Sequence, residues 1–454
     1  ETFFYAGDQV LRQLERLPWK PTRGQAVKKA EQWILERQEA DGSWGGIQPP
    51  WVYSLMALHA LGYSVDHPVM QKGIEGFRSF SIEEGDRLRV QACVSPLWDT
   101  CLTMIGLLDA GVEPDHPALA KAGEWLVEQQ VLTGGDWQVK AKGVTPGGWA
   151  FEFHNDTYPD LDDTSEIVMA LDRLELPSNG SKSQAIQRAV DWLLGMQSSN
   201  GGWASFDKDN TKALIAKLPF LDFGETIDPP SVDVTAHILE MMGQLGYSAN
   251  HPAVARGLEY IFREQEEDGP WFGRWGVNYV YGTGAVLPAF KVLGLDMQTE
   301  SVRRAVRWLF DHQNDDGGWG ESCVSYVDTA YRGRGPSTAS QTAWALLALL
   351  AADEVHHPAV RAGVAYLMRT QLDDGSWDEP YFTGTGFPGY GIGQRMSDPG
   401  TEDDDRPAGH ELPAGFMINY HMYRNCWPLM ALGRSRRLLT ADPRPPFVSV
   451  NDAG

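Results

Sequence analysis

The hydrophobic positions of this chain recur in a repeated unit built of helices. Six segments share the form aromatic–aliphatic–x3–Gln–x3/4–Gly–x–Trp; they span residues 33–44, 125–137, 192–203, 260–271, 308–319 and 366–377. Each copy ends an amphipathic helix, such as 26–37 or 301–312, whose apolar residues recur at helical spacing. The Gly supplies a left-handed turn that ends the helix. The Gln amide is expected to bond backbone groups at a helix end and to lie against the next Trp ring, which makes the motif a structural clamp.

Further helices are predicted between the copies, at 51–61, 99–110, 164–174, 231–245, 282–292 and 340–351. Helix pairs that recur every 50–90 residues or so favour a closed ring of antiparallel helices. Strand signals are few. We therefore predict an all-α fold, an α/α barrel (toroid) in which inner helices line a cavity and outer helices carry the clamp motif.

One segment carries candidate chemistry. Asp160, Asp162 and Asp163 fall within four positions, directly before the apolar run 167–171. Three carboxylates this close cannot all ionise at low cost in a dry site, so a buried cluster is expected to hold a proton at neutral pH. The alternative is a solvated helix start, with Asp163 as N-cap and Glu166 completing a capping box. The local sequence on its own favours that alternative.

Composition narrows the function classes. The 454 residues are 42% hydrophobic and 22% charged, as in ordinary globular proteins, and the net charge of -23 argues against a nucleic-acid partner. The four cysteines form no CxxC, which gives little support to a disulfide scaffold or a zinc site. No apolar run is long enough to predict a membrane-spanning helix. The chain starts at Glu1, partway through a helix-rich pattern, and we expect a preceding N-terminal portion.

With the six repeats come blocks such as 45–51 (GGIQPPW), 95–100 (SPLWDT), 233–237 (DVTAH) and 273–279 (GRWGVNY). Together they resemble the squalene–hopene cyclases, a family of triterpene cyclases, almost from end to end. The repeats resemble the family's QW motifs, and Asp160-Leu161-Asp162-Asp163 resembles its DxDD motif. The resemblance implies two α/α barrels around one apolar cavity. It makes residues 1–84 the C-terminal part of an incomplete second barrel and residues 85–454 the catalytic barrel.

The function implied by the resemblance is proton-initiated cyclisation of squalene to pentacyclic hopene or hopanol. It implies no cofactor and no metal, and a substrate that is squalene or a similar polyprenyl hydrocarbon. It also implies a bacterial protein seated in one membrane leaflet, at the cytoplasmic face of the cell membrane, in which a homodimer is possible.

Resemblance also gives roles to the acid cluster. Asp162 is the implied proton donor, and Asp160 and Asp163 are expected to stay ionised and to help hold a proton in the cluster. The helix N-terminus would stabilise the conjugate base. The titrations of such neighbours are coupled, so one pKa belongs to the group.

Three further residues complete the implied acid machinery. His237 pairs with the cluster, and Tyr281 helps to reprotonate it through water. Asp233 precedes His237 by four residues, on the same helical face, and could orient or charge the imidazole. The alternative for this pair is an ordinary satisfied pair on a helix surface.

The migrating cation needs aromatic faces and no nucleophile. Residues that match the family's cavity aromatics are Trp98, Phe151, Phe206, Trp275, Phe387, Phe416 and Tyr420, with Phe206 standing where the best-known member has Tyr. For any single ring, packing in the core is the simpler explanation. Gln48 and Pro49 match the far end of the cavity, where the cation is quenched.

Phe220 and Leu221 match a channel constriction toward the membrane. An acidic insertion near 396–412 separates Phe387 from Phe416.

Two other readings remain open. One is a related class II terpene cyclase that acts on another polyprenyl substrate, and cavity length would distinguish it. A diphosphate substrate is disfavoured because Arg256, Arg274 and Arg334 are scattered. The other is a non-catalytic or glycan-binding α/α toroid, in which the Trp residues would line an open polar cleft.

Overall fold

The protein is described by a computed structural model that covers residues 2–16, 20, 22–176, 179–212, 227–326, 328–387 and 416–441. Its α-helices are α1 (Thr2–Glu15), α2 (Arg23–Glu36), α3 (Gln48–Ala60), α4 (Pro68–Ser79), α5 (Pro96–Ala110), α6 (Pro117–Glu128), α7 (Leu161–Asp172), α8 (Asn179–Met196), α10 (Val232–Gln244), α11 (Pro252–Arg263), α12 (Tyr279–Val292), α13 (Glu300–Asp311), α14 (Ala339–Ala351), α15 (Pro358–Thr370) and α16 (Tyr423–Ala441). Short 3-10 helices are η1 (Asp136–Val139), η2 (Cys323–Tyr326) and η3 (Thr329–Tyr331). Two antiparallel two-stranded sheets are formed, one by β1 (Ser81–Glu84) with β2 (Arg87–Val90) and the other by β3 (Gly384–Phe387) with β4 (Phe416–Ile418).

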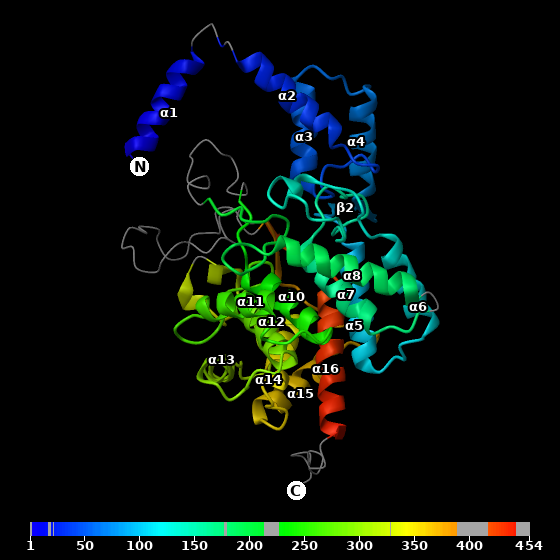
Figure 1. Cartoon of the computed structure of the whole chain (residues 1–454), viewed down its shortest axis with the longest axis vertical. Helices are drawn as coiled ribbons and strands as arrows, with labels where there is room; N and C mark the ends of the chain where they lie inside the picture. Colours follow the sequence, from blue (N-terminus) through cyan, green and yellow to red (C-terminus); the bar gives the residue numbers. More distant parts are fainter. Residues whose placement is uncertain are drawn as a thin grey trace.

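Inner helices form a closed ring. Helices α5, α7, α10, α12, α14 and α16 contact one another in that order, and α16 returns to α5. Helices α6, α8, α11, α13 and α15 pack on the outside of the ring (Figure 1). The prediction of an all-α toroid is confirmed, with five inner helices at the predicted places. The sixth, α16, was not predicted.

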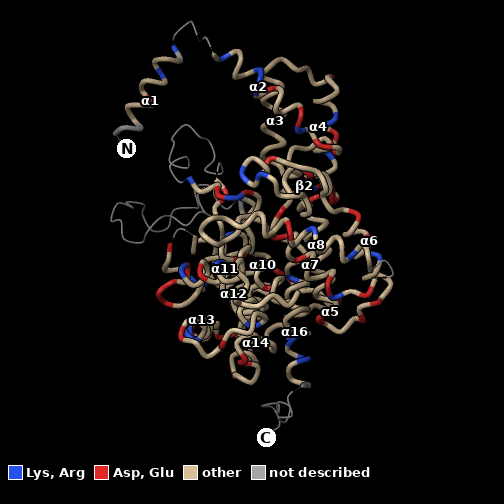
Figure 2. The backbone as a smooth tube through the Cα atoms, in the orientation of Figure 1, with Lys and Arg blue, Asp and Glu red and all other residues tan. Residues whose placement is uncertain are grey.

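The two layers differ in the way the sequence predicts. Every residue of α14 from Ala339 to Leu350 is buried, because this inner helix is surrounded by neighbours. The outer helix α13 buries one stripe only, which includes Val302, Val306 and Leu309. Figure 2 accordingly shows charged residues mainly on loops and outer helices.

The clamp motif joins consecutive outer helices. In the third copy, the Gln197 amide donates to the carbonyls of Gly201 (2.8 Å) and of Ala253 in α11 (2.9 Å). The indole N–H of Trp203 donates to the Leu193 carbonyl in α8 (2.7 Å). Its backbone N–H donates to the hydroxyl of Thr235 in α10 (2.9 Å), so the clamp also holds an inner helix. The structural interpretation of the motif agrees with this geometry.

The second copy differs from the predicted one. The Gln130 amide binds the carbonyl of Gly147 (2.7 Å), and the indole that donates to Leu126 belongs to Trp149 (2.6 Å). The clamp Trp is therefore Trp149, and Trp137 instead packs edge-on against Trp192. The loop between Gln130 and Gly147 is an insertion within the motif, which is why the fixed spacing selected the wrong Trp.

Helices α2 to α4 form a segment with a hydrophobic core of its own, which includes Trp44, Trp51 and Phe80. The barrel has a separate core. The predicted boundary at residues 84 and 85 falls in the turn of the β1–β2 hairpin. The interpretation of residues 1–84 as part of a second barrel stays a prediction.

Candidate active site

A cavity of about 490 Å³ lies between the α2–α4 segment and the N-terminal ends of the inner helices. Trp33, Trp44 and Ile47 of the segment form one part of its wall. On the barrel side the lining includes Trp98, Phe151, Phe206, Trp275, Tyr281, Tyr420 and Tyr423, together with Asp160, Asp162 and Asp163. The structure therefore places the acid cluster and most of the predicted aromatic residues around one space.

The acid cluster forms the start of α7. Asp160 is the N-cap: its extended backbone places Oδ1 to accept from the N–H groups of Asp162 (2.7 Å) and Asp163 (3.3 Å). The exposed fractions of Asp160, Asp162 and Asp163 are 7%, 7% and 2%. The alternative of a solvated helix start, capped by Asp163 and Glu166, is thus wrong.

Burial changes the protonation expected of two of these acids. It raises the pKa of Asp160 well above its ordinary value, and the neighbouring Asp162 charge raises it further. Burial likewise raises the pKa of Asp163, with Asp160 and Asp162 adding to the effect. These directions run against the expectation that Asp160 and Asp163 remain ionised. They agree with the expectation that the cluster retains a proton.

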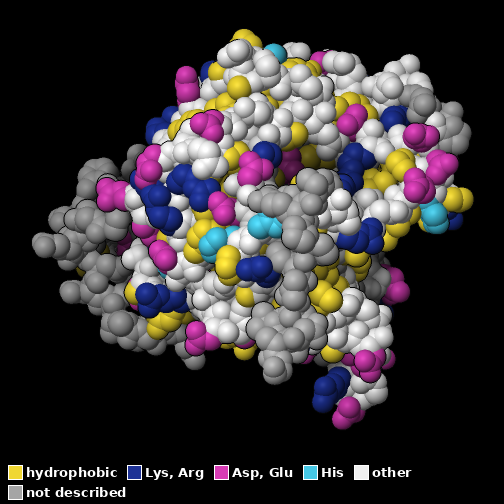
Figure 3. All heavy atoms as spheres, turned by 90° about the horizontal axis from the view of Figure 1, so that it is seen from below, with side chains coloured by type: hydrophobic (Ala, Val, Ile, Leu, Met, Phe, Trp, Pro, Cys, Tyr) yellow, Lys and Arg dark blue, Asp and Glu magenta, His cyan; other side chains and the backbone are white. Residues whose placement is uncertain are grey.

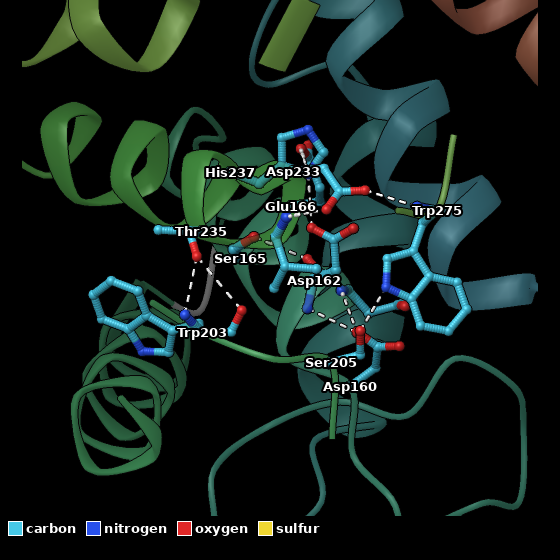
Figure 4. Close-up of polar contacts among 12 residues, drawn as sticks. Asp160, Asp162, Ser165, Glu166, Trp203, Ser205, Asp233, Thr235, His237 and Trp275 are labelled. Carbon is cyan, nitrogen blue, oxygen red and sulfur yellow. Dashed lines mark hydrogen bonds and ion pairs between the residues drawn. The ribbon is translucent and has the colours of Figure 1, made fainter. Parts of the chain in front are cut away.

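His237 of α10 contacts the cluster directly. Its Nδ1 lies 2.7 Å from Oδ1 of Asp162 and 3.8 Å from Oε1 of Glu166 (Figure 4). Burial lowers the pKa of His237, but the Asp162 carboxylate and its hydrogen bond, followed by Glu166, raise that pKa to about 10. An ionised Asp162 therefore favours the cationic form of the imidazole. Sequence analysis missed the contact of Glu166, whose only signal was its position four residues after Asp162.

Asp233 is buried too, so the helix-surface alternative for Asp233 and His237 is wrong. Its Oδ2 accepts hydrogen bonds from the backbone N–H groups of Arg274 (2.9 Å) and Trp275 (2.8 Å) (Figure 4). The Asp233 charge also raises the pKa of His237. Its geometric role is to hold the loop that places Trp275 in the cavity wall.

Hydrogen bonds from the indole N–H groups hold two tryptophans of the cavity wall in place. The indole N–H of Trp275 donates to the Ser205 hydroxyl (2.6 Å), and that of Trp98 donates to the Tyr423 hydroxyl (3.0 Å). Tyr423 stacks on Tyr420 at 4.4 Å between ring centroids. Tyr423 was not predicted, although it lies three residues after Tyr420, at the start of α16.

The remaining predicted residues are placed as follows. Tyr281 of α12 is buried and meets His237 edge-on, with ring centroids 6.0 Å apart. Phe387 and Phe416 face each other in the backbone register of β3 and β4. The side chains of these two Phe residues are not among those that the structure describes. Phe220, Leu221 and the insertion 396–412 also lie outside the described residues.

Gln48 and Pro49 are not brought into the cavity. The Gln48 amide donates to the backbone carbonyls of Val90 (3.1 Å) and Gln91. Their neighbours Ile47 and Pro50 contribute to the lining instead. The quenching role of Gln48 and Pro49 therefore stays a prediction.

Among the residues with a described placement, no group of three or more His, Cys, Asp or Glu side chains is arranged to hold a metal ion. Within the same residues, no helix has both the length and the hydropathy needed to cross a membrane.

The fold belongs to the class seen in type II terpene cyclases. Type II terpene cyclase MstE from Scytonema superposes with a TM-score of 0.53 at 16% identity, covering 92% of this chain and 99% of that one. The ent-copalyl diphosphate synthase of Streptomyces platensis gives a TM-score of 0.53 at 16% identity and covers 87% of this chain and 59% of that one.

The sequence identifies the family. The squalene-hopene cyclase C-terminal domain model matches residues 94–395 and 390–437, and the N-terminal domain model matches residues 1–86. The chain belongs to the squalene–hopene cyclase family. It is 48% identical to the squalene–hopene cyclase of Alicyclobacillus acidocaldarius and 42% identical to the dammaradiene synthase of Dryopteris crassirhizoma, over 96% and 98% of its length. It spans 65% of the length of each of these relatives.

Proposed function

We propose that this protein cyclises squalene to pentacyclic hopene or hopanol, with Asp162 as the acid that starts the reaction. The observation that carries the proposal is the buried Asp162–His237 pair in the wall of an aromatic-lined cavity. The names of its relatives support a triterpene cyclase.

The first step transfers one proton. The O–H bond of the Asp162 carboxylic acid breaks, a C–H bond forms at the terminal alkene, and the other alkene carbon becomes a tertiary cation. Asp162 is left as a carboxylate, which is stabilised by the cationic His237 at 2.7 Å and by its place at the N-terminus of α7. Each further alkene then attacks the cation and forms a C–C bond.

Aromatic rings suit the intermediate cations. Trp98, Phe151, Phe206, Trp275 and Tyr420 line the same cavity as Asp162 and present π-electrons without a strong nucleophile. One such ring stabilises a desolvated cation by about 2 kcal/mol. Loss of a proton from the final cation gives hopene, and capture of water gives hopanol.

The proposed substrate also suggests where in the cell the protein works. Squalene dissolves in the apolar part of a bilayer, so we propose that the protein sits in one leaflet at the cytoplasmic face of the cell membrane, as its family resemblance implies. A homodimer is part of the same proposal. Co-sedimentation with liposomes tests the first point, and light scattering in detergent tests the second.

Incubation of the full-length protein with squalene in detergent, followed by mass spectrometry of the neutral lipids, tests the reaction. Pentacyclic products are expected at the mass of squalene, or at that mass plus one water. Turnover of a shorter polyprenyl chain in place of squalene would favour the related class II cyclase instead. No turnover of either would contradict the catalytic proposal.

A further inference from the structure

An ion pair that the repeat does not require joins the α2–α4 segment to the barrel. Nη2 of Arg37, the C-cap of α2, lies 2.8 Å and 3.0 Å from the two carboxylate oxygens of Asp136, the first residue of η1. Asp136 belongs to the loop inserted in the second clamp copy. The residue before the clamp Gln is Arg only in the first copy, since the other five copies have Gln129, Met196, Glu264, His312 and Thr370 there. Both partners are therefore additions to the common pattern.

The same carboxylate is also anchored on the barrel side. The hydroxyl of Tyr158 donates to Oδ2 of Asp136 (2.6 Å), and the Asp136 backbone N–H donates to the carbonyl of Thr157 (3.3 Å). Gly135 permits this close approach, because a Cβ there would lie 2.2 Å from the Thr157 carbonyl oxygen. Asp136 thus links Arg37 of the segment to the stretch of chain that enters α7.

That stretch connects stiffly to the acid cluster. Only Pro159 separates Tyr158 from the N-cap Asp160, and its ring fixes one backbone angle and restricts the residue before it to extended conformations. The backbone N–H of Asp160 donates to the carbonyl of Trp149 (2.7 Å), and its side chain caps α7. A displacement of Tyr158 is therefore passed on to the start of α7, because no flexible linker lies between them.

The protonation states suit a permanent link. Burial raises the pKa of Asp136, but the hydrogen bonds from Arg37 and Tyr158 outweigh it, so this pKa lies below its ordinary value. Burial and the bond to Asp136 raise the pKa of Tyr158. At neutral pH the carboxyl group is thus ionised, and the phenol keeps the proton that it donates.

The link lies in the wall of the large cavity, which Trp33, Arg37, Tyr158 and Asp160 all line. The guanidinium carbon of Arg37 is 4.2 Å from the centroid of the Trp33 ring. The side chains of Arg37 and Asp136 are 21% and 36% exposed, so solvent screens their attraction and the pair contributes little to stability. Its two-point contact nevertheless fixes the orientation of both groups.

Resting on the proposed function, we propose that Arg37 is a positioning residue for the acid that starts the cyclisation. It acts through Asp136 and Tyr158, which hold the chain at the N-terminus of α7 in place. A misplacement of about 1 Å can cost an enzyme 10²-fold in rate, so a small shift of Asp162 is enough to slow proton transfer. The α2–α4 segment thereby contributes to the reaction through the geometry of the acid cluster.

Arg37→Met tests the proposal, because it removes the charge and keeps an apolar side chain beside Trp33. We expect kcat for squalene to fall by about tenfold or more and KM to change by less than about twofold. The melting temperature should stay within about 2 °C of wild type, since a partly exposed ion pair stabilises little. Arg37→Lys should recover part of the loss in kcat, because Lys can keep one hydrogen bond to Asp136.

Arg303→Met is the matched control. Arg303 pairs with Glu354 at 2.7 Å, with side chains 24% and 20% exposed, and joins α13 to the turn after α14. This turn follows the C-terminal end of α14, away from the cavity; Figure 3 views the molecule from that side and shows Lys and Arg side chains lying beside Asp and Glu side chains. Arg303→Met should leave kcat unchanged. An equal fall of kcat in both variants would overturn the positioning role.

A double-mutant cycle tests the route of the effect. Tyr158→Phe keeps the ring and loses only the hydroxyl that binds Asp136. If Arg37 acts through Tyr158, the double variant Arg37→Met/Tyr158→Phe should have a kcat within about twofold of the slower single variant. Losses that multiply would show that the two residues act independently and would overturn this route.

A measurement without turnover separates the positioning role from the proposed function. The backbone N–H groups of Asp162 and Asp163 bond to the Asp160 side chain, and hydrogen–deuterium exchange of the peptide 160–166 reports on these bonds. Exchange there should be on the order of tenfold faster in Arg37→Met but not in Arg303→Met, with no change in α14.

Unchanged exchange at the start of α7 would overturn the positioning role even in an active enzyme, and faster exchange throughout the barrel would show a general loss of stability instead. Faster exchange confined to the start of α7, in a protein that cyclises no polyprenyl substrate, would support the link from Arg37 to the acid cluster and refute the proposed reaction.

Discussion

The proposed reaction needs an acid that is protonated before the alkene is attacked and stable as an anion afterwards, and different neighbours of Asp162 meet these two demands. Burial raises the pKa of Asp160 and Asp163, so the cluster retains protons. His237, with a pKa near 10, keeps a positive charge within 2.7 Å of the developing carboxylate. The cost of burying this many acids is offset by the N-cap bonds of Asp160 and by one imidazolium.

Asp162→Asn should abolish cyclisation of squalene, because an amide of nearly the same shape has no acidic proton to give. A fall of at least 10²-fold in kcat/KM is expected, measured by gas chromatography of the products. The fold should remain, since the N-cap bonds use the side chain of Asp160 and not that of Asp162.

Asp191→Asn on the exposed side of α8 is the matched control, and it should leave both turnover and melting temperature unchanged. Retained turnover in Asp162→Asn would refute the assignment of the proton donor.

At the scale of single elements, the clamp motif connects the repeat to the site. The backbone N–H of Trp149 donates to Thr164 in the first turn of α7, and that of Trp203 donates to Thr235 in the first turn of α10. These are the helices that carry Asp162 and His237. These two clamps therefore fix the starting positions of α7 and α10, while Trp149 and Trp203 themselves stay out of the cavity lining.

Trp203→Ala should lower the melting temperature first. It removes a fully buried indole and leaves a void, which costs about 3–5 kcal/mol in comparable cores. Trp203→Phe should cost less, because it keeps one aromatic ring, leaves a smaller void and loses the hydrogen bond to Leu193, which is worth about 1 kcal/mol. A changed product pattern without any loss of stability would contradict the structural role.

The same elements show what the sequence could and could not predict. The pattern of hydrophobic residues located α5, α7, α10, α12 and α14, because inner helices are apolar on all sides whereas outer helices are apolar along one stripe. The fixed spacing of the clamp motif selected Trp137 in place of Trp149 in the second copy, because such a spacing cannot reveal an inserted loop. It also could not reveal that Glu166 meets His237, because that contact depends on how α7 packs against α10.

At the scale of the whole molecule, the α2–α4 segment contacts the barrel through a partly buried ion pair and, beside it, buried acidic groups. Arg37 pairs with Asp136 at 2.8 Å, and Asp136 also accepts from the Tyr158 hydroxyl at 2.6 Å, two residues before the acid cluster. Nearby, the carboxyl groups of Glu39 and Glu152 share a hydrogen bond. Sequence gave no sign of this junction, because its partners are more than 90 residues apart.

The junction makes stability depend on pH in a definite direction. Burial, followed by the Glu39 charge, raises the pKa of Glu152 from an ordinary 4.5 to about 8. Between these values the folded state holds a proton that the unfolded state has lost, so the free energy of unfolding falls as pH rises, by at most about 1.4 kcal/mol per pH unit for one group. The contribution is complete below about pH 4.5 and is lost above about pH 8. Glu166 acts in the same direction.

Glu152→Gln should therefore flatten the decline of melting temperature between pH 5 and pH 8, because it removes one of the titrating groups while keeping a side chain that can hydrogen-bond to Glu39. Differential scanning fluorimetry across this range measures the slope, with the exposed Glu124→Gln on α6 as the control that should match wild type. A slope in Glu152→Gln equal to that of wild type would mean that the two glutamates do not share a proton. The segment would then be held on the barrel by Arg37, Asp136 and apolar contacts alone.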